Sequence, residues 1–140
     1  MGIPFYGQNG QGSIMDVFAN AKVVKFALEV ANGSGNTNNS DTGADIPAGY
    51  IPIMSVVKNT GSVALAGNAC ALDAGGVDVT ADVNGLAAGA EIAFNVGAFS
   101  SSTSAVNILI DGGSHLRTAS STAIVEFVII CIPAAKMSAL

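Results

Sequence analysis

The alternation of apolar and polar residues along the chain predicts short β-strands. Residues 22–30 give the clearest case, because the even positions from Val24 to Val30 are all large and apolar, whereas the odd positions mix Val, Lys, Ala and Glu. Successive side chains of a strand point to opposite faces, so a period of two predicts a strand with one face on a hydrophobic core. We therefore expect a strand at Lys22–Val30.

Further runs of β-forming residues follow, and clusters of Gly, Asn, Asp and Ser separate them in the way that turns do. A short run of this kind, bounded by turn residues, is typical of a strand in a sandwich or barrel. The additional strands expected from these runs are Ile46–Asn59, Ser62–Leu72, Val77–Asn84, Ala90–Val96, Ala105–Ile110 and Thr122–Ile132.

Three local features refine this assignment. Pro47 and Pro52 restrict the run at Ile46–Asn59 to the edge of a sheet or to the start of a strand. Residues 31–45 consist of small and turn-forming residues that cannot pack a core, so we expect a long loop that is either mobile or functional. The polar positions of Val77–Asn84 predict one solvent-facing side, made of Asp78, Thr80, Asp82 and Asn84.

The last expected strand, Thr122–Ile132, is apolar on both faces. Its odd positions from Val125 to Cys131 face one way, and its even positions face the other way with Glu126 as their only charge. In an antiparallel sandwich the outer face of a strand is normally polar, so this outer face requires a cover. The cover is the N-terminal arm or another subunit, and the second alternative predicts self-association through Ile124, Val128 and Ile130.

We interpret residues 1–20 as an N-terminal arm and residues 21–140 as one β-sandwich domain. Gly, Gln and Asn alternate in the arm with a few apolar residues, and Ser13–Phe18 fits a short helical turn with Ser13 as its cap. An arm of this kind packs on its own domain or contacts a partner. The arm residues expected to contact a partner are Ile3, Phe5, Tyr6, Ile14 and Phe18.

These strands and the absence of a convincing longer helix predict an all-β fold. Roughly seven or eight short strands suit a jelly-roll-like antiparallel β-sandwich or an immunoglobulin-like sandwich. The chain has no tryptophan, and therefore lacks the Cys…Trp…Cys spacing of immunoglobulin domains. We therefore expect the jelly-roll-like sandwich with an extended N-terminal arm.

Composition narrows the classes of partner. Half of the residues are apolar, only 11% are charged and the net charge is −5. The five basic residues form no cluster, so no nucleic-acid partner is expected, because such a partner requires a basic footprint on phosphates. The longest apolar run, Phe127–Ala135, is too short to cross a bilayer, and residues 1–20 lack the pattern of a signal peptide, so no membrane partner is expected.

The inventory of reactive side chains predicts no enzyme. His115 is the only histidine, and its neighbours Ser114 and Asp111 share one short turn, where the geometry of a catalytic triad is hard to hold. Cys70 and Cys131 have no basic neighbours and are interpreted as buried reduced thiols, with a disulfide left open. We therefore predict no catalytic residue and no cofactor.

No metal site is predicted either. The acidic positions around Val77–Asn84 invite comparison with a calcium-binding loop, but an EF-hand starting at Asp78 requires Gly and Glu where the chain has Val83 and Gly89. Strand alternation already accounts for these carboxylates.

Two stretches resemble a known family. DIPAGYIPIMSVVKNTG at Asp45–Gly61 and NILIDGGSHLRTASSTAIVEFVI at Asn107–Ile129 occur in the order polar loop, strand, small-residue strand, Gly-rich turn and final hydrophobic strand. Over roughly residues 22–132 this order resembles the small β-sandwich head-decoration, or cement, proteins of tailed bacteriophages. The individual motifs are short, and residues 1–20 match nothing in that family.

The resemblance implies a jelly-roll-like homotrimer on the capsid surface of a virion, assembled in the host cytoplasm. Its partner would be the major capsid protein, and it would bind where capsid subunits meet and stabilise the head. Three contacts on one rigid trimer would act together, so avidity would supply the affinity. The alternative from the residues alone is a tail or fibre module that recognises a host-surface glycan through the loop at residues 31–45.

Overall fold

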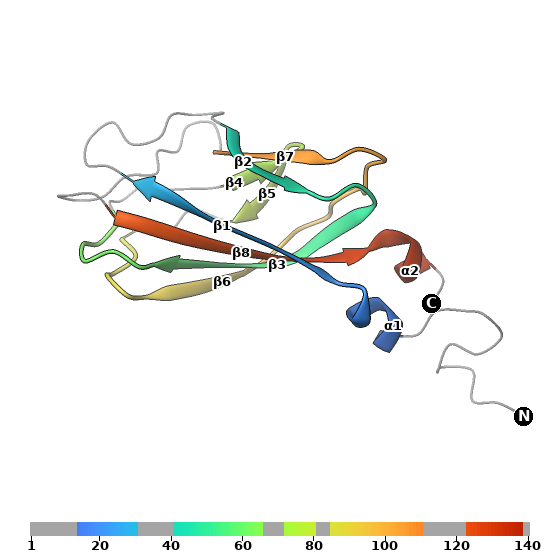
Figure 1. Ribbon diagram of the computed structural model, residues 1–140, viewed down its shortest axis with the longest axis horizontal. Coiled ribbons are helices and arrows are strands. Elements are labelled where there is room, and N and C mark those ends of the chain that lie inside the picture. The colour runs from blue at the N-terminus through green and yellow to red at the C-terminus, as the bar shows by residue number, and fades with distance from the viewer. Residues whose placement is uncertain (1–13, 31–40, 66–71, 81–84, 111–122, 139–140) are drawn as a thin grey trace, which may run out of the picture.

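Two antiparallel four-stranded sheets pack face to face in the computed structural model (Figure 1). The structure describes residues 14–30, 41–65, 72–80, 85–110 and 123–138. The first sheet has the order β1 (Lys22–Val30), β8 (Ala123–Pro133), β3 (Tyr50–Asn59) and β6 (Glu91–Asn95). The second sheet has the order β2 (Asp41–Ile46), β7 (Val106–Ile110), β4 (Leu72–Ala74) and β5 (Val77–Thr80).

The strand pairs are nested in the manner of a jelly roll. β1 pairs with β8, β2 with β7, β3 with β6 and β4 with β5, and every one of these pairs is antiparallel. The chain therefore follows one long hairpin whose tip is the β4–β5 turn, and successive pairs of this hairpin fall alternately into the two sheets. This topology confirms the predicted jelly-roll-like sandwich.

The hydrophobic core lies between the sheets, and β8 contributes most to it. Phe127 is fully buried and stacks on Phe26 of β1, with ring centroids 5.1 Å apart and an interplanar angle of 15°. The alternation predicted for this strand is confirmed, because the residues of its inner face are all fully buried. These residues are Val125, Phe127, Ile129 and Cys131.

The prediction of a loop over residues 31–45 is wrong for its last part. Asp41–Ile46 forms β2, and the Thr42 hydroxyl donates a hydrogen bond to the carbonyl of Ile108 on β7, at 2.7 Å. The inward positions of β2 are Thr42, Ala44 and the buried Ile46, so two of the three are too small to signal a core-facing strand. Residues 31–40 lie outside the described residues.

The strand predicted at Ser62–Leu72 is wrong for its first part, and among the described residues of this range only Leu72 belongs to a strand, as the first residue of β4. Residues 61–63 form a bend after β3, and the amide of Gly61 donates to Oδ1 of Asn59 at 3.0 Å. The Asn59 amide group in turn donates to the carbonyl of Val63 at 2.8 Å. A buried side chain thus bends the chain where the sequence pattern favours an extended strand; residues 66–71 are not described.

Although β3 is an interior strand, Pro52 lies near its start, where only β8 pairs with it, as the prediction of a sheet edge or a strand start requires. β3 has β8 on one side and β6 on the other. The proline is tolerated because its register with β8 shifts between Pro52 and Met54, and because β6 pairs with β3 only from Met54 onward. A proline at such an irregularity removes no regular ladder hydrogen bond.

Thr80 corrects the predicted solvent face of β5. Its side chain is buried, and its hydroxyl oxygen accepts a hydrogen bond from the amide of Leu72 at 2.9 Å. The β4–β5 ladder shifts register between Leu72 and Asp73, and the hydroxyl satisfies an amide at this shift. Asp78 is exposed as predicted, whereas Asp82 and Asn84 lie outside the described residues.

Two short helices, α1 (Ile14–Ala19) and α2 (Ala134–Ser138), lie together at one end of the sandwich (Figure 1). α1 occupies most of the predicted helical turn at residues 13–18. α2 was not predicted, because it is only five residues long and follows the apolar run of β8 directly.

Candidate interaction surfaces

The described residues hold no chemistry that points to a catalytic or metal site. They contain no group of three or more His, Cys, Asp or Glu side chains that could hold a metal ion. His115 and Cys70 lie outside the described residues, as do Ser114 and Asp111. Among the described residues, no helix is long and apolar enough to cross a bilayer.

The Cys131 thiol is buried on the inner face of β8. Burial raises its pKa from 9.0 to about 11, because desolvation disfavours the thiolate. We expect this thiol to resist alkylation in the folded protein and to react once the protein unfolds, as peptide mass spectrometry after iodoacetamide treatment would show.

The same shift predicts how stability depends on pH. The folded pKa lies above the unfolded value of 9.0, so the free energy of unfolding keeps its full value below that pH. It then falls as the pH rises toward about 11, by about 2–3 kcal/mol. Denaturant titrations at several pH values between about 9 and 11 should show that the free energy of unfolding falls more steeply with pH in wild type than in Cys131→Ala. A slope shared by both proteins would contradict the assignment.

The outer face of the first sheet is largely apolar. In the register of the strands, Val23 on β1 lies opposite Ile130 on β8, and Ile130 lies opposite Met54 on β3. Val23 is 62% exposed, Ile124 is 50% exposed, and the side chains in the middle of the sheet are half-buried by their neighbours. We call these residues the apolar outer face: Val23, Ala27, Met54, Val56, Ala93, Ile124, Val128 and Ile130.

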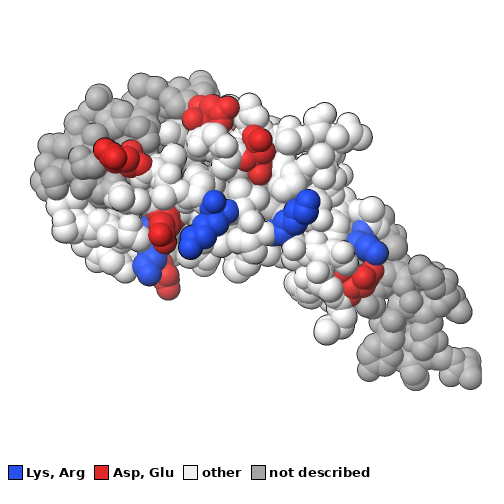
Figure 2. Space-filling view, in the orientation of Figure 1, with Lys and Arg blue, Asp and Glu red and all other residues white. Residues whose placement is uncertain are grey.

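The predicted self-association residues Ile124, Val128 and Ile130 all belong to this face. Charges of both signs also lie within it, since Glu126 on β8 lies opposite Ala27 and Lys58, and Lys25 on β1 lies opposite Val128. Figure 2 shows lysines and carboxylates mixed over the lower part of the view, whereas only carboxylates lie along its upper edge.

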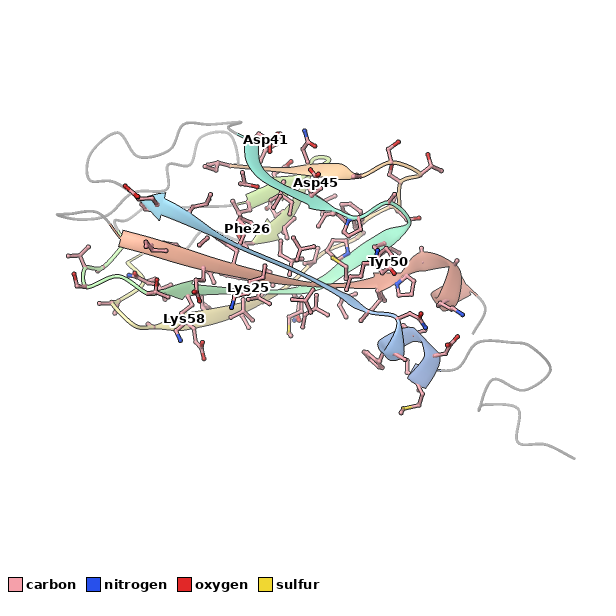
Figure 3. The ribbon with its side chains drawn as sticks, viewed as in Figure 1. Lys25, Phe26, Asp41, Asp45, Tyr50 and Lys58 are labelled. Atoms are coloured by element: carbon pink, nitrogen blue, oxygen red, sulfur yellow. The ribbon has the colours of Figure 1, made fainter. Side chains whose placement is uncertain are left out.

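The outer face of the second sheet is acidic instead. Asp41 and Asp73 both lie opposite Leu109 on β7, and Asp73 also lies opposite Asp78 on β5. The four strands of this sheet contain no Lys or Arg. Figure 3 shows Asp41 and Asp45 on β2 at one side of the sandwich, with Lys25 and Lys58 at the other. Burying carboxylates against a partner costs more free energy than burying apolar side chains. The outer face of the first sheet is therefore the better contact face.

Helix α1 is a second exposed apolar feature, and it is fixed to the sandwich. Val17 is buried, and the Asp16 carboxylate forms an ion pair with Lys136 of α2 at 3.0 Å. After the helix, the Tyr50 hydroxyl donates to the carbonyl of Asn20 at 3.3 Å. The ammonium of Lys22 lies 4.6 Å from the centre of the Tyr50 ring.

The opposite side of α1 faces solvent. Ile14 is 52% exposed and Phe18 57%, and both were predicted as contact residues of the arm. Met15 was not predicted as a contact residue, although it is the most exposed of the three at 73%. Residues at positions i, i+1 and i+4 lie on one side of a helix, and this spacing could have identified Met15. Ile3, Phe5 and Tyr6 lie outside the described residues.

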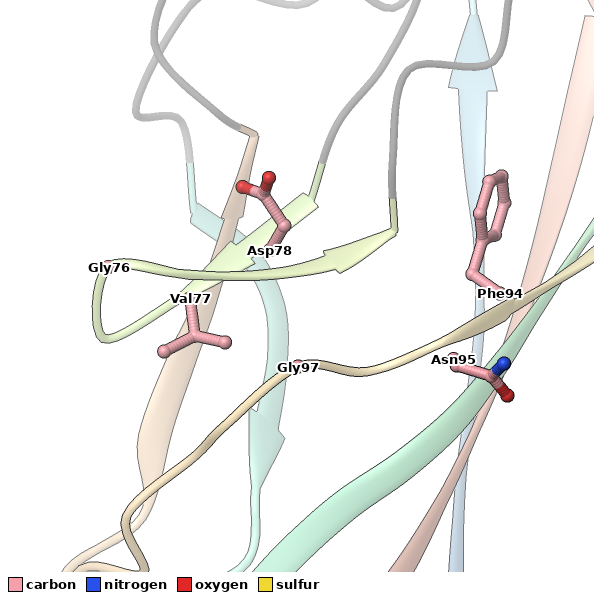
Figure 4. Close-up of a pocket in the computed structure, with 6 residues that line it drawn as sticks. All are labelled: Gly76, Val77, Asp78, Phe94, Asn95 and Gly97. Atoms are coloured by element: carbon pink, nitrogen blue, oxygen red, sulfur yellow. The ribbon is translucent and has the colours of Figure 1, made fainter.

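An open pocket of about 510 Å³ lies where the edge strands β5 and β6 of the two sheets face each other (Figure 4). Its volume falls within the range of small-molecule sites. Gly76 and Gly97 line it without side chains, and the other lining residues are two apolar and two polar ones. The lining residues are Gly76, Val77, Asp78, Phe94, Asn95 and Gly97.

The sequence matches no protein-family model and no curated protein.

Proposed function

We propose that this protein is a virion structural protein that decorates the head of a tailed bacteriophage and binds between major capsid subunits. The observation that carries the proposal is α1, which presents three exposed apolar side chains on a helix held to the sandwich by an ion pair and a buried valine. The jelly-roll topology and the sequence resemblance support the same function. The location that follows is the outer surface of the capsid.

The exposed side of α1 suits an anchor. Ile14, Met15 and Phe18 lose little conformational entropy on docking, because the helix that carries them is already ordered. An apolar cluster at one end of the sandwich also leaves both sheet faces available for other contacts. This arrangement favours end-on attachment at a seam between capsid subunits.

The apolar outer face supports the second part of the proposal, a homotrimer. Burying this face between copies would remove the exposed side chains of Val23 and Ile124 from water. Each Å² of apolar surface buried would stabilise the assembly by roughly 25 cal/mol. A trimer would carry three copies of α1, and simultaneous attachment of all three would raise the avidity far above the affinity of one helix.

Replacing Ile14 and Phe18 together with Asp tests the anchor. We expect the double variant to keep the fold, because both side chains face solvent, and to bind shells of the major capsid protein at least tenfold more weakly. Co-sedimentation with those shells measures the binding, and circular dichroism checks the fold. Asp45→Ala, on the acidic face, is the matched control and should bind like wild type. Undiminished binding by the double variant would exclude α1 as the anchor.

A second function, recognition of a host-surface glycan by a tail or fibre module, is favoured by the pocket between β5 and β6. Asn95 and Asp78 give it polar walls, and Phe94 and Val77 give it apolar walls. This combination suits the polar hydroxyls and apolar ring faces of a sugar. Glycan-array binding that Asn95→Ala abolishes would favour this function over capsid decoration.

A further inference from the structure

β1 differs from the other three edge strands of the sandwich. β6 has only five residues and β5 only four, and β2 shifts register between Asp41 and Asp45. β1 pairs with β8 over nine consecutive residues without any shift, and it contains neither proline nor glycine. Proteins usually blunt such edges with prolines, bulges or short strands, because an edge offers unpaired backbone groups to another strand. β1 carries none of these three, and its protection against pairing is limited to its exposed charges, Lys22, Lys25 and Glu29.

The sequence of β1 is self-complementary in one antiparallel register. When a second copy is paired with Ala27 opposite Ala27, Lys25 falls opposite Glu29 of the second copy, and Glu29 falls opposite its Lys25. In the same register Phe26 meets Leu28, and Val24 meets Val30, so apolar side chains also meet apolar side chains. A two-fold axis through Ala27 repeats each of these pairs.

Apart from Val30, which is fully buried in the core, these residues gain little from their own chain. Lys25 and Glu29 are both exposed and lie about 13 Å apart along the strand, too far to form an ion pair with each other. Their direct neighbours on β8 are the apolar Val128 and Ile124. Phe26 and Leu28 face the core but remain only half-buried at this edge.

We propose that β1 is the docking strand for a second copy of this chain. Two copies join edge to edge and antiparallel, so that their four-stranded sheets become one continuous sheet across the two-fold axis. The contact uses neither α1 nor the centre of the apolar outer face, so it goes beyond capsid binding and can exist without it. In combination with the proposed trimer it would join trimers in pairs.

Charge variants test the register. K25E and E29K each place like charges opposite one another twice, and we expect either change to raise the dissociation constant of the pair about tenfold or more. The double variant K25E/E29K restores both ion pairs with the same composition as wild type, so it should associate like wild type. An equal mixture of the two single variants should form a heterodimer. Light scattering and ion-mobility mass spectrometry measure these masses.

A cysteine crosslink tests the position of the axis. Residues opposite each other in an antiparallel pair have Cα atoms about 4.5–5.5 Å apart, which a disulfide can span. Ala27→Cys should therefore form a disulfide-linked dimer under mild oxidation, whereas Val23→Cys, on the same exposed face of β1, should not. Wild type treated in the same way gives the background from its own cysteines.

The outcomes separate this proposal from the capsid function. Recovery of association in K25E/E29K, together with the Ala27→Cys crosslink, supports the β1 contact whether or not capsid shells are bound. An assembly mass that does not change in K25E and E29K, or a wild type that stays a monomer or a trimer at every concentration, would overturn it. Capsid binding by K25E would still report on α1 alone.

Discussion

Asn59→Asp is expected to lower the free energy of unfolding by about 4 kcal/mol or more. Asn59 is fully buried at the end of β3, and its Nδ2 donates to the carbonyls of Val63 at 2.8 Å and Leu86 at 3.1 Å. A carboxylate keeps the bond from the Gly61 amide but loses both donors. It also sets a buried negative charge against two carbonyl oxygens.

Chemical denaturation of Asn59→Asp and of Asn95→Asp measures this effect. Asn95 is exposed on β6, so the same chemical change there should alter the free energy of unfolding by less than about 0.5 kcal/mol. The deficit of Asn59→Asp should shrink at low pH, because burial raises the pKa of the new carboxyl and protonation removes its charge. Equal stability of the two variants would contradict the role assigned to Asn59.

Phe127→Ala is expected to cost about 3–5 kcal/mol. Phe127 is the largest of the fully buried side chains, and it stacks on Phe26 between the sheets, where the loss of a ring leaves a cavity. Strands on both sides of β8 hold it in place, so the site has little freedom to collapse. Differential scanning calorimetry or urea denaturation would show the loss.

Ile124→Ala on the same strand provides the contrast. Ile124 is half exposed on the outer face, so its truncation should cost less than about 1 kcal/mol in a dilute monomer. If copies associate through this face, the same substitution should weaken association while leaving the monomer stable. A large loss of monomer stability in Ile124→Ala would place that side chain in the core, contrary to the structure.

The strands that the sequence predicts best are those with large side chains at every inward position. Lys22–Val30 was predicted with its observed bounds, because Val24, Phe26 and Leu28 mark one face without interruption. β2 was missed because Thr42 and Ala44 give no such signal. The strand expected at Ser62–Leu72 is wrong for its first part, because apolar content does not reveal that the Asn59 side chain bonds the backbone of Gly61 and Val63 and bends it.

The candidate surfaces were predictable only in part. Ile14 and Phe18 could be named because they are apolar residues in a polar arm, and both are exposed on α1. The apolar outer face was visible only through β8, because the contributions of Val23 and Met54 depend on a cross-strand register that a sequence pattern does not contain. The self-complementary pattern of β1 can be read from the sequence alone. It predicts a contact between copies only once the structure shows that β1 is an edge strand.

The nested strand order has a consequence for synthesis of the chain. β8 lies between β1 and β3 in the first sheet. β1 and β3 are synthesised early, but they can form their hydrogen bonds to β8 only after the last strand of the chain has been made. Contacts between residues so distant in sequence make folding slow, because the chain loses the entropy of loop closure before the strand pairs form and stabilise it. A nascent chain on the ribosome therefore exposes the inner faces of β1 and β3 until β8 emerges. Only a chain translated through β8 escapes aggregation and becomes competent for assembly.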